Sequence, residues 1–224
     1  MTKQSTPSRG RAGQPPRGPA PSRRTPILAI GGAVLAVVVV IGIAIAAAGS
    51  GGDDDDRPVF GPVTVEGTAL TPLPDAGADP AEGQVAPTLT GRSPDGDRVG
   101  LGGQGEPTLV AFLAHWCPHC QAELPVLVDL ADDGAFEGIR TVAVLTGTNP
   151  DAPNFPPASW LDREGWDGDV LLDNDAQAAA RAYGLTSYPL LVALDADGNV
   201  VGRMSGEQPA AVVTALADAA RGSD

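Results

Sequence analysis

The sequence predicts an α/β fold with a mixed central sheet flanked by helices, preceded by one transmembrane helix and a flexible tether. In the C-terminal part, short continuous apolar runs, typical of strands buried on both faces, alternate with helical stretches. The turn signal at 195–199 follows one such run and predicts an antiparallel hairpin. A separate stretch of 22 residues without a charged or polar side chain lies near the N-terminus. Together these patterns predict an α/β sandwich behind a membrane anchor.

The apolar stretch at 27–48 is long enough to cross a membrane. As a helix with a rise of about 1.5 Å per residue it would span about 33 Å, against a hydrocarbon core of about 30 Å. Six basic residues and no acidic residue precede its end, whereas four aspartates follow at 53–56. The positive-inside rule then predicts a disordered basic cytoplasmic tail at 1–26 and an extracytoplasmic chain after it. The alternative is a cleaved signal peptide, whose apolar core usually has only about 7 to 15 residues.

The remaining chain divides by composition into a tether and a domain. Residues 49–84 are rich in Gly, Pro and Asp with little apolar periodicity, which predicts a flexible linker. Residues 85–224 are enough for one domain with its own core. The net charge of −14 argues against nucleic-acid binding, and two cysteines are too few for a disulfide-stapled scaffold. We therefore expect a single-pass protein of the cell membrane with one extracytoplasmic domain.

The elements expected within the domain follow from the apolar runs and their periodicity. Continuous runs predict three buried strands, and the hairpin predicts a fourth strand that returns beside the third, at 108–114, 141–145, 190–194 and 200–204. Helical stretches are expected between and after them, at 118–131, 158–163, 176–183 and 209–220.

Both cysteines and both histidines of the chain fall within the six residues from His115 to Cys120. The motif directly follows a predicted buried strand and begins a predicted helix. A thiolate at a helix N-terminus meets unpaired N–H groups and the positive end of the helix dipole, and Pro118 suits the first turn. His119 adds a donor or a positive charge beside the sulfur. We therefore expect Cys117 to ionise readily and act as nucleophile, with Cys120 as the buried resolving thiol.

Two other uses of these residues fit their spacing less well. A structural disulfide with this spacing would close too short a loop to remove much entropy from the unfolded chain. A zinc site would need all of His115, Cys117, His119 and Cys120, and one helical turn cannot wrap four ligands around one ion. Redox chemistry of the two cysteines is favoured, with no metal or other cofactor expected.

Matches outside the motif point to a family. From residue 86 to 221 the chain resembles the thioredoxin fold, and more closely the membrane-anchored TlpA/ResA-like thiol-disulfide oxidoreductases. The matching positions are Ala86-Pro87, the stretch from Ala114 to Cys120, Glu123 and Pro125, 182–185, Tyr188-Pro189, 195–198 and Gly206. The ordered combination is much more specific than the two spaced cysteines alone.

The resemblance implies roles for three residues around the cysteines. Pro189 corresponds to the family's cis-proline, which faces the active-site cysteines, and the backbone of Tyr188 corresponds to groups that pair with the substrate chain. Trp116 would shape the rim beside Cys117 and contact substrate; the alternative is an aromatic side chain that only packs.

Glu123 corresponds to an acidic residue of the family placed three positions after the second cysteine. The resemblance implies that it raises the pKa of the buried thiol or relays its proton. The alternative is an exposed glutamate stabilised by the helix dipole. Thioredoxins themselves have a buried aspartate on the strand before the motif, and Ala111 stands at that position here.

The Pro-His pair between the cysteines resembles that of DsbA-type oxidants, whereas the surrounding sequence resembles reductases. The reduction potentials of thioredoxin and DsbA differ by about 150 mV, or about 7 kcal/mol, so the direction of transfer stays open. The expected function is disulfide exchange with protein thiols and disulfides outside the cytoplasm through Cys117 and Cys120, with a further redox protein as partner. One alternative is a peroxiredoxin-like thiol peroxidase, although Ala114 stands where those enzymes have threonine. The other is a non-enzymatic soft-metal-binding (metallochaperone) module.

Overall fold

The computed structural model describes residues 55–103 and 105–222. The predicted cytoplasmic tail at 1–26 and the predicted transmembrane helix at 27–48 lie outside these ranges, as do the first residues of the predicted tether. Within the described ranges, no helix combines the length and the apolar character needed to cross a membrane.

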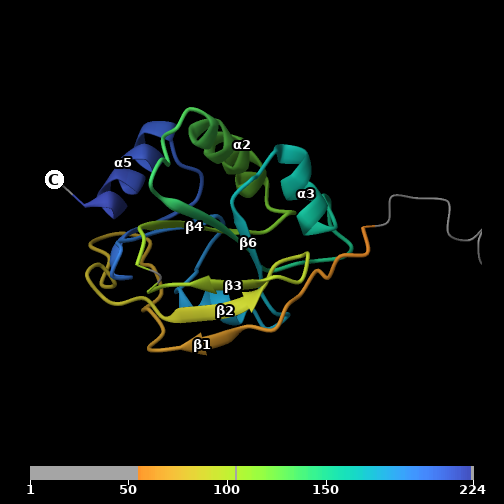
Figure 1. The fold of residues 1–224 in the computed structure, drawn as a ribbon, viewed down its shortest axis with the longest axis horizontal. Helices are drawn as coiled ribbons and strands as arrows, with labels where there is room; N and C mark the ends of the chain where they lie inside the picture. Colours follow the sequence, from red (N-terminus) through yellow and green to blue (C-terminus); the bar gives the residue numbers. More distant parts are fainter. Residues whose placement is uncertain (1–54, 104, 223–224) are drawn as a thin grey trace, which may run out of the picture. The chain divides into compact units, whose positions relative to one another are not determined.

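A mixed sheet lies at the centre of the domain (Figure 1). It has five strands in the order β6-β5-β4-β7-β8. Its parallel part consists of β4 (Thr108–Leu113), β5 (Arg140–Leu145) and β6 (Asp169–Leu172). The antiparallel part is the hairpin of β7 (Leu190–Leu194) and β8 (Val200–Ser205). The mixed sheet and its hairpin confirm the α/β fold predicted for the domain. Strand β6 was not predicted because it has only three apolar residues and follows a polar, glycine-containing connection.

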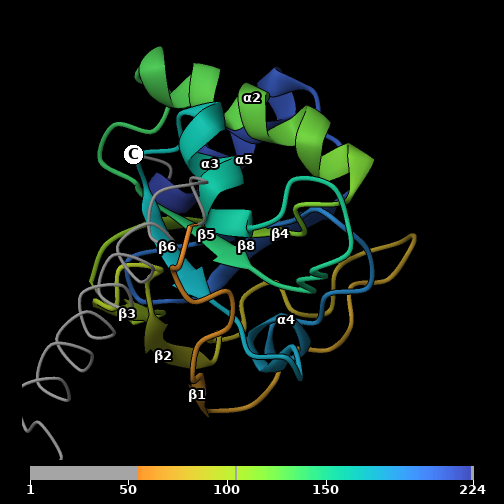
Figure 2. The ribbon, with the colours of Figure 1, turned by 90° about the vertical axis from the view of Figure 1, so that its right-hand side faces the viewer.

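Helices and a second sheet cover the two faces of the central sheet (Figure 2). One face carries α2 (Pro118–Asp132), α3 (Pro157–Glu164) and α5 (Ala210–Arg221), and the other carries α4 (Ala178–Ala182). Side chains of β4 alternate between the two sides: Leu113 packs with the helices α2 and α5, whereas Phe112 belongs to the opposite core. Burial on both faces explains why the central strands are continuous apolar runs.

The second sheet was not expected from the sequence. It consists of three antiparallel strands in the order β1-β2-β3, formed by β1 (Thr64–Glu66), β2 (Thr88–Arg92) and β3 (Arg98–Leu101). The apolar pattern of these strands is weak, because threonine and arginine lie on the outer face and Gly91 interrupts β2. A side chain at Gly91 would come 3.2 Å from Leu171 of β6, so this glycine lets the small sheet pack closely on the central one.

The prediction of a flexible tether at 49–84 is wrong for the residues from 55 onward. This segment contributes β1, and it buries Leu70 and Ala81 in the core beneath the central sheet. The carboxylate of Asp79 accepts a hydrogen bond from Nε of Arg203 at 2.8 Å, and both side chains are buried. Arg203 also donates to the carbonyl of Tyr183. The buried apolar side chains and the contact between Asp79 and Arg203 therefore fix a segment whose composition alone predicts flexibility.

We expect Asp79→Ala to lower the free energy of unfolding by about 3 to 5 kcal/mol, because it leaves the guanidinium of Arg203 buried without its partner. Urea titration of the described domain measures this change. The exposed Asp75 in the same segment provides the control, since Asp75→Ala should change stability by less than about 0.5 kcal/mol. Equal effects of the two substitutions would contradict the anchoring role.

The contact between Asp79 and Arg203 also predicts how the stability of the domain changes at acidic pH. Hydrogen bonds from Arg203 lower the pKa of Asp79 against the opposing effect of burial. Because the folded-state pKa is depressed, the stability that Asp79 contributes is present above its unfolded-state pKa of about 3.9 and is lost as the pH falls through the folded value. The stability difference between the wild type and Asp79→Ala should therefore be constant near neutral pH and shrink below about pH 4.

Candidate active site

The six-residue motif lies at the junction between β4 and α2, as predicted. Cys117 is the N-cap of α2, with an extended backbone, and Pro118 is the first helical residue. The N–H of Cys117 donates to the carbonyl of Ala114, and the carbonyl of Cys117 accepts from Gln121. The turn therefore places the first cysteine where the unpaired N–H groups of the helix begin.

The two sulfurs occupy different environments. Both cysteines are free thiols, and Cys117 is 7% exposed while Cys120 is fully buried. Sγ of Cys120 accepts a hydrogen bond from the N–H of Ala114 at 3.4 Å. Burial raises the pKa of the Cys120 thiol well above its ordinary range, and this hydrogen bond opposes the rise only in part. Cys120 therefore stays protonated near neutral pH, and Cys117 is the thiol that substrates can reach.

The peptide bond between Tyr188 and Pro189 is cis, as the resemblance implied. Strand β7 pairs antiparallel with β4, and Leu190 lies opposite Phe112, so the segment before β7 reaches the end of β4 where the motif begins. The carbonyl oxygen of Tyr188 lies 3.9 Å from Sγ of Cys117. The structure thus brings Tyr188, Pro189 and Cys117 together.

Trp116 and Tyr188 form an aromatic pair at the rim. Their rings meet edge to face, with centroids 5.8 Å apart. Nε1 of Trp116 donates to the carbonyl of Gly147 at 2.7 Å, and the hydroxyl of Tyr188 donates to Gln177. Gly147 has a φ of 61°, and a Cβ there would come within 2.5 Å of the Tyr188 hydroxyl. The tight turn at Gly147 therefore requires glycine, and it holds both rings beside Cys117.

His115 is buried and cannot serve as a metal ligand. Its Nε2 accepts from the N–H of Asn149 at 3.2 Å, so Nδ1 carries the proton and donates to the carbonyl of Pro153 at 2.7 Å. Burial lowers the pKa of His115, which is consistent with this neutral form. Because both ring nitrogens are engaged by backbone, one of the four ligands that a zinc site would need is absent.

His119 lies on the exposed surface of the first turn of α2. Its Nδ1 is 3.3 Å from a carboxylate oxygen of Glu207, which precedes α5. The sequence predicts a role for His119 beside the sulfur of Cys117, and the structure directs its ring to Glu207. Its effect on the thiol stays a prediction.

Glu123 is fully buried, so the alternative of an exposed helical glutamate is wrong. One carboxylate oxygen accepts from the N–H of Gln208 at 2.7 Å, and among the described residues no group donates to the other oxygen. Burial raises the pKa of Glu123, and the charge of Glu123 contributes to the raised pKa of Cys120. A buried acid with a free oxygen near a buried thiol is suited to take up and return its proton.

Comparison with known proteins identifies the family. Residues 81–219 match the Redoxin family, which is more than half of the chain. The chain belongs to the Redoxin family. The thiol-disulfide oxidoreductase ResA of Bacillus subtilis (strain 168) is 26% identical over 127 residues, which cover 56% of this chain and 68% of that protein.

Two solved structures resemble the Redoxin domain. A thiol:disulfide interchange protein of the thioredoxin family from Chlorobium tepidum TLS is 25% identical, with a TM-score of 0.51, covering 65% of this chain and 99% of its own. A putative thioredoxin from Neisseria meningitidis is 27% identical, with a TM-score of 0.52, covering 62% of this chain and 91% of its own. Together with the ResA homologues, they show that this Redoxin-family chain is a thiol-disulfide oxidoreductase with a thioredoxin-like fold.

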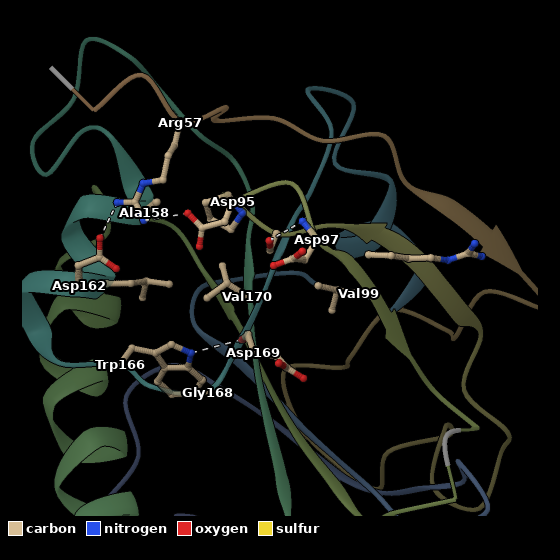
Figure 3. Close-up of a pocket in the computed structure, with 14 residues that line it drawn as sticks. Arg57, Asp95, Asp97, Val99, Ala158, Asp162, Trp166, Gly168, Asp169 and Val170 are labelled. Carbon is tan, nitrogen blue, oxygen red and sulfur yellow. Dashed lines mark hydrogen bonds and ion pairs between the residues drawn. The ribbon is translucent and has the colours of Figure 1, made fainter.

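A cavity of about 270 Å³ lies away from the motif (Figure 3). It is lined by Asp169 at the start of β6 and by Arg57, which forms ion pairs with Asp95 and Asp162. Because β4, β5 and β6 run parallel, the start of β6 lies at the opposite end of the sheet from the motif, which follows β4. None of the residues that line this cavity is a cysteine or a histidine, so the thiol chemistry belongs to the motif.

Several contacts of the site involve residues that the sequence did not single out for it. Gly147 and Asn149 lie in one turn, and a Gly-Thr-Asn-Pro sequence signals that turn without indicating what it binds. Gln208 reaches Glu123 through its backbone N–H, a contact for which no side-chain pattern exists.

The unequal thiols predict selective alkylation. In the reduced enzyme near pH 8, iodoacetamide should modify Cys117 faster than Cys120 by about tenfold or more, because Cys120 is buried and its raised pKa keeps it protonated. Mass spectrometry of tryptic peptides measures the two rates. In guanidinium chloride both cysteines should react alike, which provides the control. Equal rates in the folded protein would contradict the assignment of the buried thiol.

Proposed function

We propose that the chain is a membrane-anchored enzyme that exchanges disulfides with proteins outside the cytoplasm through Cys117 and Cys120. One observation supports this most directly: a thiol at the N-terminus of α2 lies one helical turn from a fully buried thiol and faces the carbonyl of Tyr188. This arrangement separates an attacking sulfur from a resolving sulfur, which two-step exchange through a mixed disulfide requires.

The exchange begins with one sulfur of the enzyme. In the reducing direction the Cys117 thiolate attacks a substrate disulfide, forms a mixed disulfide and releases the first substrate thiolate, which takes a proton from water. Cys120 then loses its proton and attacks Sγ of Cys117. The internal disulfide forms and the second substrate thiolate leaves, so the enzyme loses two electrons and the substrate gains them. The oxidising direction is the reverse, and the reduction potential of the pair sets which direction predominates.

Glu123 handles the proton of the buried thiol in this proposal. The pKa of Cys120 is raised, so its deprotonation needs a nearby base, and the carboxylate of Glu123 has one oxygen to which no described residue donates. In the reducing direction Glu123 accepts the proton of Cys120, and in the oxidising direction it returns the proton to that sulfur.

The rim residues hold the substrate chain beside Cys117. The carbonyl of Tyr188 faces this sulfur and offers an acceptor for a backbone N–H of an extended substrate segment. The ring of Trp116 is partly exposed and fixed by Gly147, so it offers a rigid apolar contact next to the sulfur. His119 lies on the exposed side of the first turn of α2, where Glu207 contacts its ring.

The proposed location rests on the sequence. The apolar stretch at 27–48 has the length of a membrane span, and the distribution of basic residues favours an extracytoplasmic domain. Disulfide exchange suits such a compartment, where protein disulfides form and persist. A further redox protein must then restore the thiols or the disulfide after each turnover.

The roles of the two cysteines predict opposite trapping behaviour. Cys120→Ser should accumulate mixed disulfides with substrate proteins, because the second step is blocked after Cys117 has reacted. Cys117→Ser should accumulate none, since Cys120 is fully buried. Non-reducing electrophoresis of the full-length variants after acid quenching measures the adducts. Equal trapping by both variants would overturn the assignment of roles.

The proposed topology predicts protease access from outside. In spheroplasts of a producing bacterium, an added protease should digest the domain of the full-length chain, while a cytoplasmic protein in the same cells stays intact. Removal of residues 27–48 should shift the protein from the membrane fraction to the soluble fraction. Protection of the domain in intact spheroplasts would refute the extracytoplasmic location.

A further inference from the structure

Large apolar side chains are exposed at three positions in the described part of the chain. They are Val85, Trp116 and Phe155, which are 67%, 36% and 39% exposed. Val85 pairs with Asn199 beside the β7–β8 turn, at the end of β7 away from the motif. Trp116 belongs to the motif, and Phe155 lies in the connection between β5 and α3. Exposed aromatic side chains that gather at one place mark interaction sites more often than scattered ones do.

Phe155 is tied to the motif by His115. Its ring meets the imidazole edge to face, with centroids 6.0 Å apart. The two residues before it also bind His115: the carbonyl of Pro153 accepts from Nδ1, and the side chain of Asn154 donates to the backbone carbonyl at 3.3 Å. Phe155 therefore packs on a buried, hydrogen-bonded ring and keeps part of its surface in water.

The same connection also holds Trp116. The carbonyl of Gly147 accepts the hydrogen bond of the Trp116 indole, and the N–H of Asn149 donates to the ring of His115. The connection therefore binds two consecutive residues of the motif. Trp116 directly precedes Cys117 in sequence, and Phe155 packs on the residue before Trp116. The two partly exposed aromatic side chains are therefore both fixed around the segment that leads to the reactive sulfur. Rigid aromatic side chains of this kind are frequent anchors of protein recognition.

We propose that Phe155 is a specificity-determining residue which, together with Trp116, binds an apolar side chain next to the reacting cysteine of an extended substrate segment. This inference rests on the proposed function and narrows its substrates to segments that expose an apolar side chain beside the cysteine, as an unfolded chain does. Folded proteins bury most such side chains. Continuity with the rim at Trp116 and Tyr188 favours this occupant over a second copy of the chain.

The test uses two synthetic peptide disulfides that differ only beside the cysteine. One peptide has leucine on both sides of its single cysteine, the matched peptide has serine there, and each is used as its symmetric disulfide. Glutathione disulfide is the small substrate. Full-length enzyme, reduced beforehand and freed of reductant, is mixed with an excess of each disulfide. The second-order rate constants are measured from the loss of the two enzyme thiols, followed by mass spectrometry of acid-quenched and alkylated enzyme.

Phe155→Ala should lower the rate constant with the leucine peptide by about tenfold, which is typical of truncating an aromatic anchor. The rate constants with the serine peptide and with glutathione disulfide should change by less than twofold, and the reduction potential should not change. Phe155→Leu, which keeps an apolar side chain, should restore most of the rate. Val85→Ala is the control for loss of an exposed apolar side chain away from the motif, and it should leave all three rates unchanged.

Three results would overturn the proposal in distinguishable ways. An equal loss with all three disulfides would show that Phe155 acts structurally through His115 and does not bind substrate. No loss with the leucine peptide would refute the binding of an apolar substrate side chain by Phe155. If Phe155→Ala then has a lower oligomeric mass than the wild type by analytical ultracentrifugation, the surface is a contact between two copies. Absence of reaction between the wild type and every disulfide would refute the proposed function itself.

Discussion

The arrangement of the site depends on the tight turn between β4 and α2, which buries one sulfur and leaves the other at the end of a helix. Strand β4 is buried along its whole length, and its pairing with β5 and β7 fixes where it ends. The N–H of Ala114 then binds Sγ of Cys120 directly. Because β4 cannot shift without exposing apolar side chains, the position of Cys120 is set by the core. The difference between the two thiols follows from this burial.

The parts of the fold that the sequence predicts are those whose local pattern coincides with burial. The strands at 108–113 and 190–194 are continuous apolar runs because both faces of the sheet are covered. The strands of the small sheet are short and carry polar side chains on one face, so their pattern is weak. The segment between β1 and β2 is held by the contact of Asp79 with Arg203, and these two residues are 124 positions apart. No local pattern can indicate such a pairing, and composition alone led to the prediction of a tether.

Some features of the candidate site could likewise be predicted from the sequence and others could not. The cysteines could be predicted because they stand in one short motif, whereas the cis bond before Pro189 was implied only by the resemblance to the family. No local pattern predicts the burial of Glu123, since its partner is the backbone N–H of Gln208, 85 positions away. His115 entered the sequence argument only as a possible zinc ligand, because its two backbone partners lie in a connection whose path the sequence does not reveal.

The buried acid of this site comes from a different element than in thioredoxins, and this has a structural consequence. Ala111, at the strand position of the thioredoxin aspartate, is packed in the same apolar cluster as Cys120, and the carboxylate is supplied from α2 by Glu123. One oxygen of Glu123 is bound by Gln208, and the adjacent Glu207 contacts His119 on the exposed side of the same helix. Two consecutive residues before α5 therefore hold both the buried acid and the exposed histidine. A displacement of that one segment would therefore change the surroundings of the buried carboxylate and of the exposed first turn of α2 together.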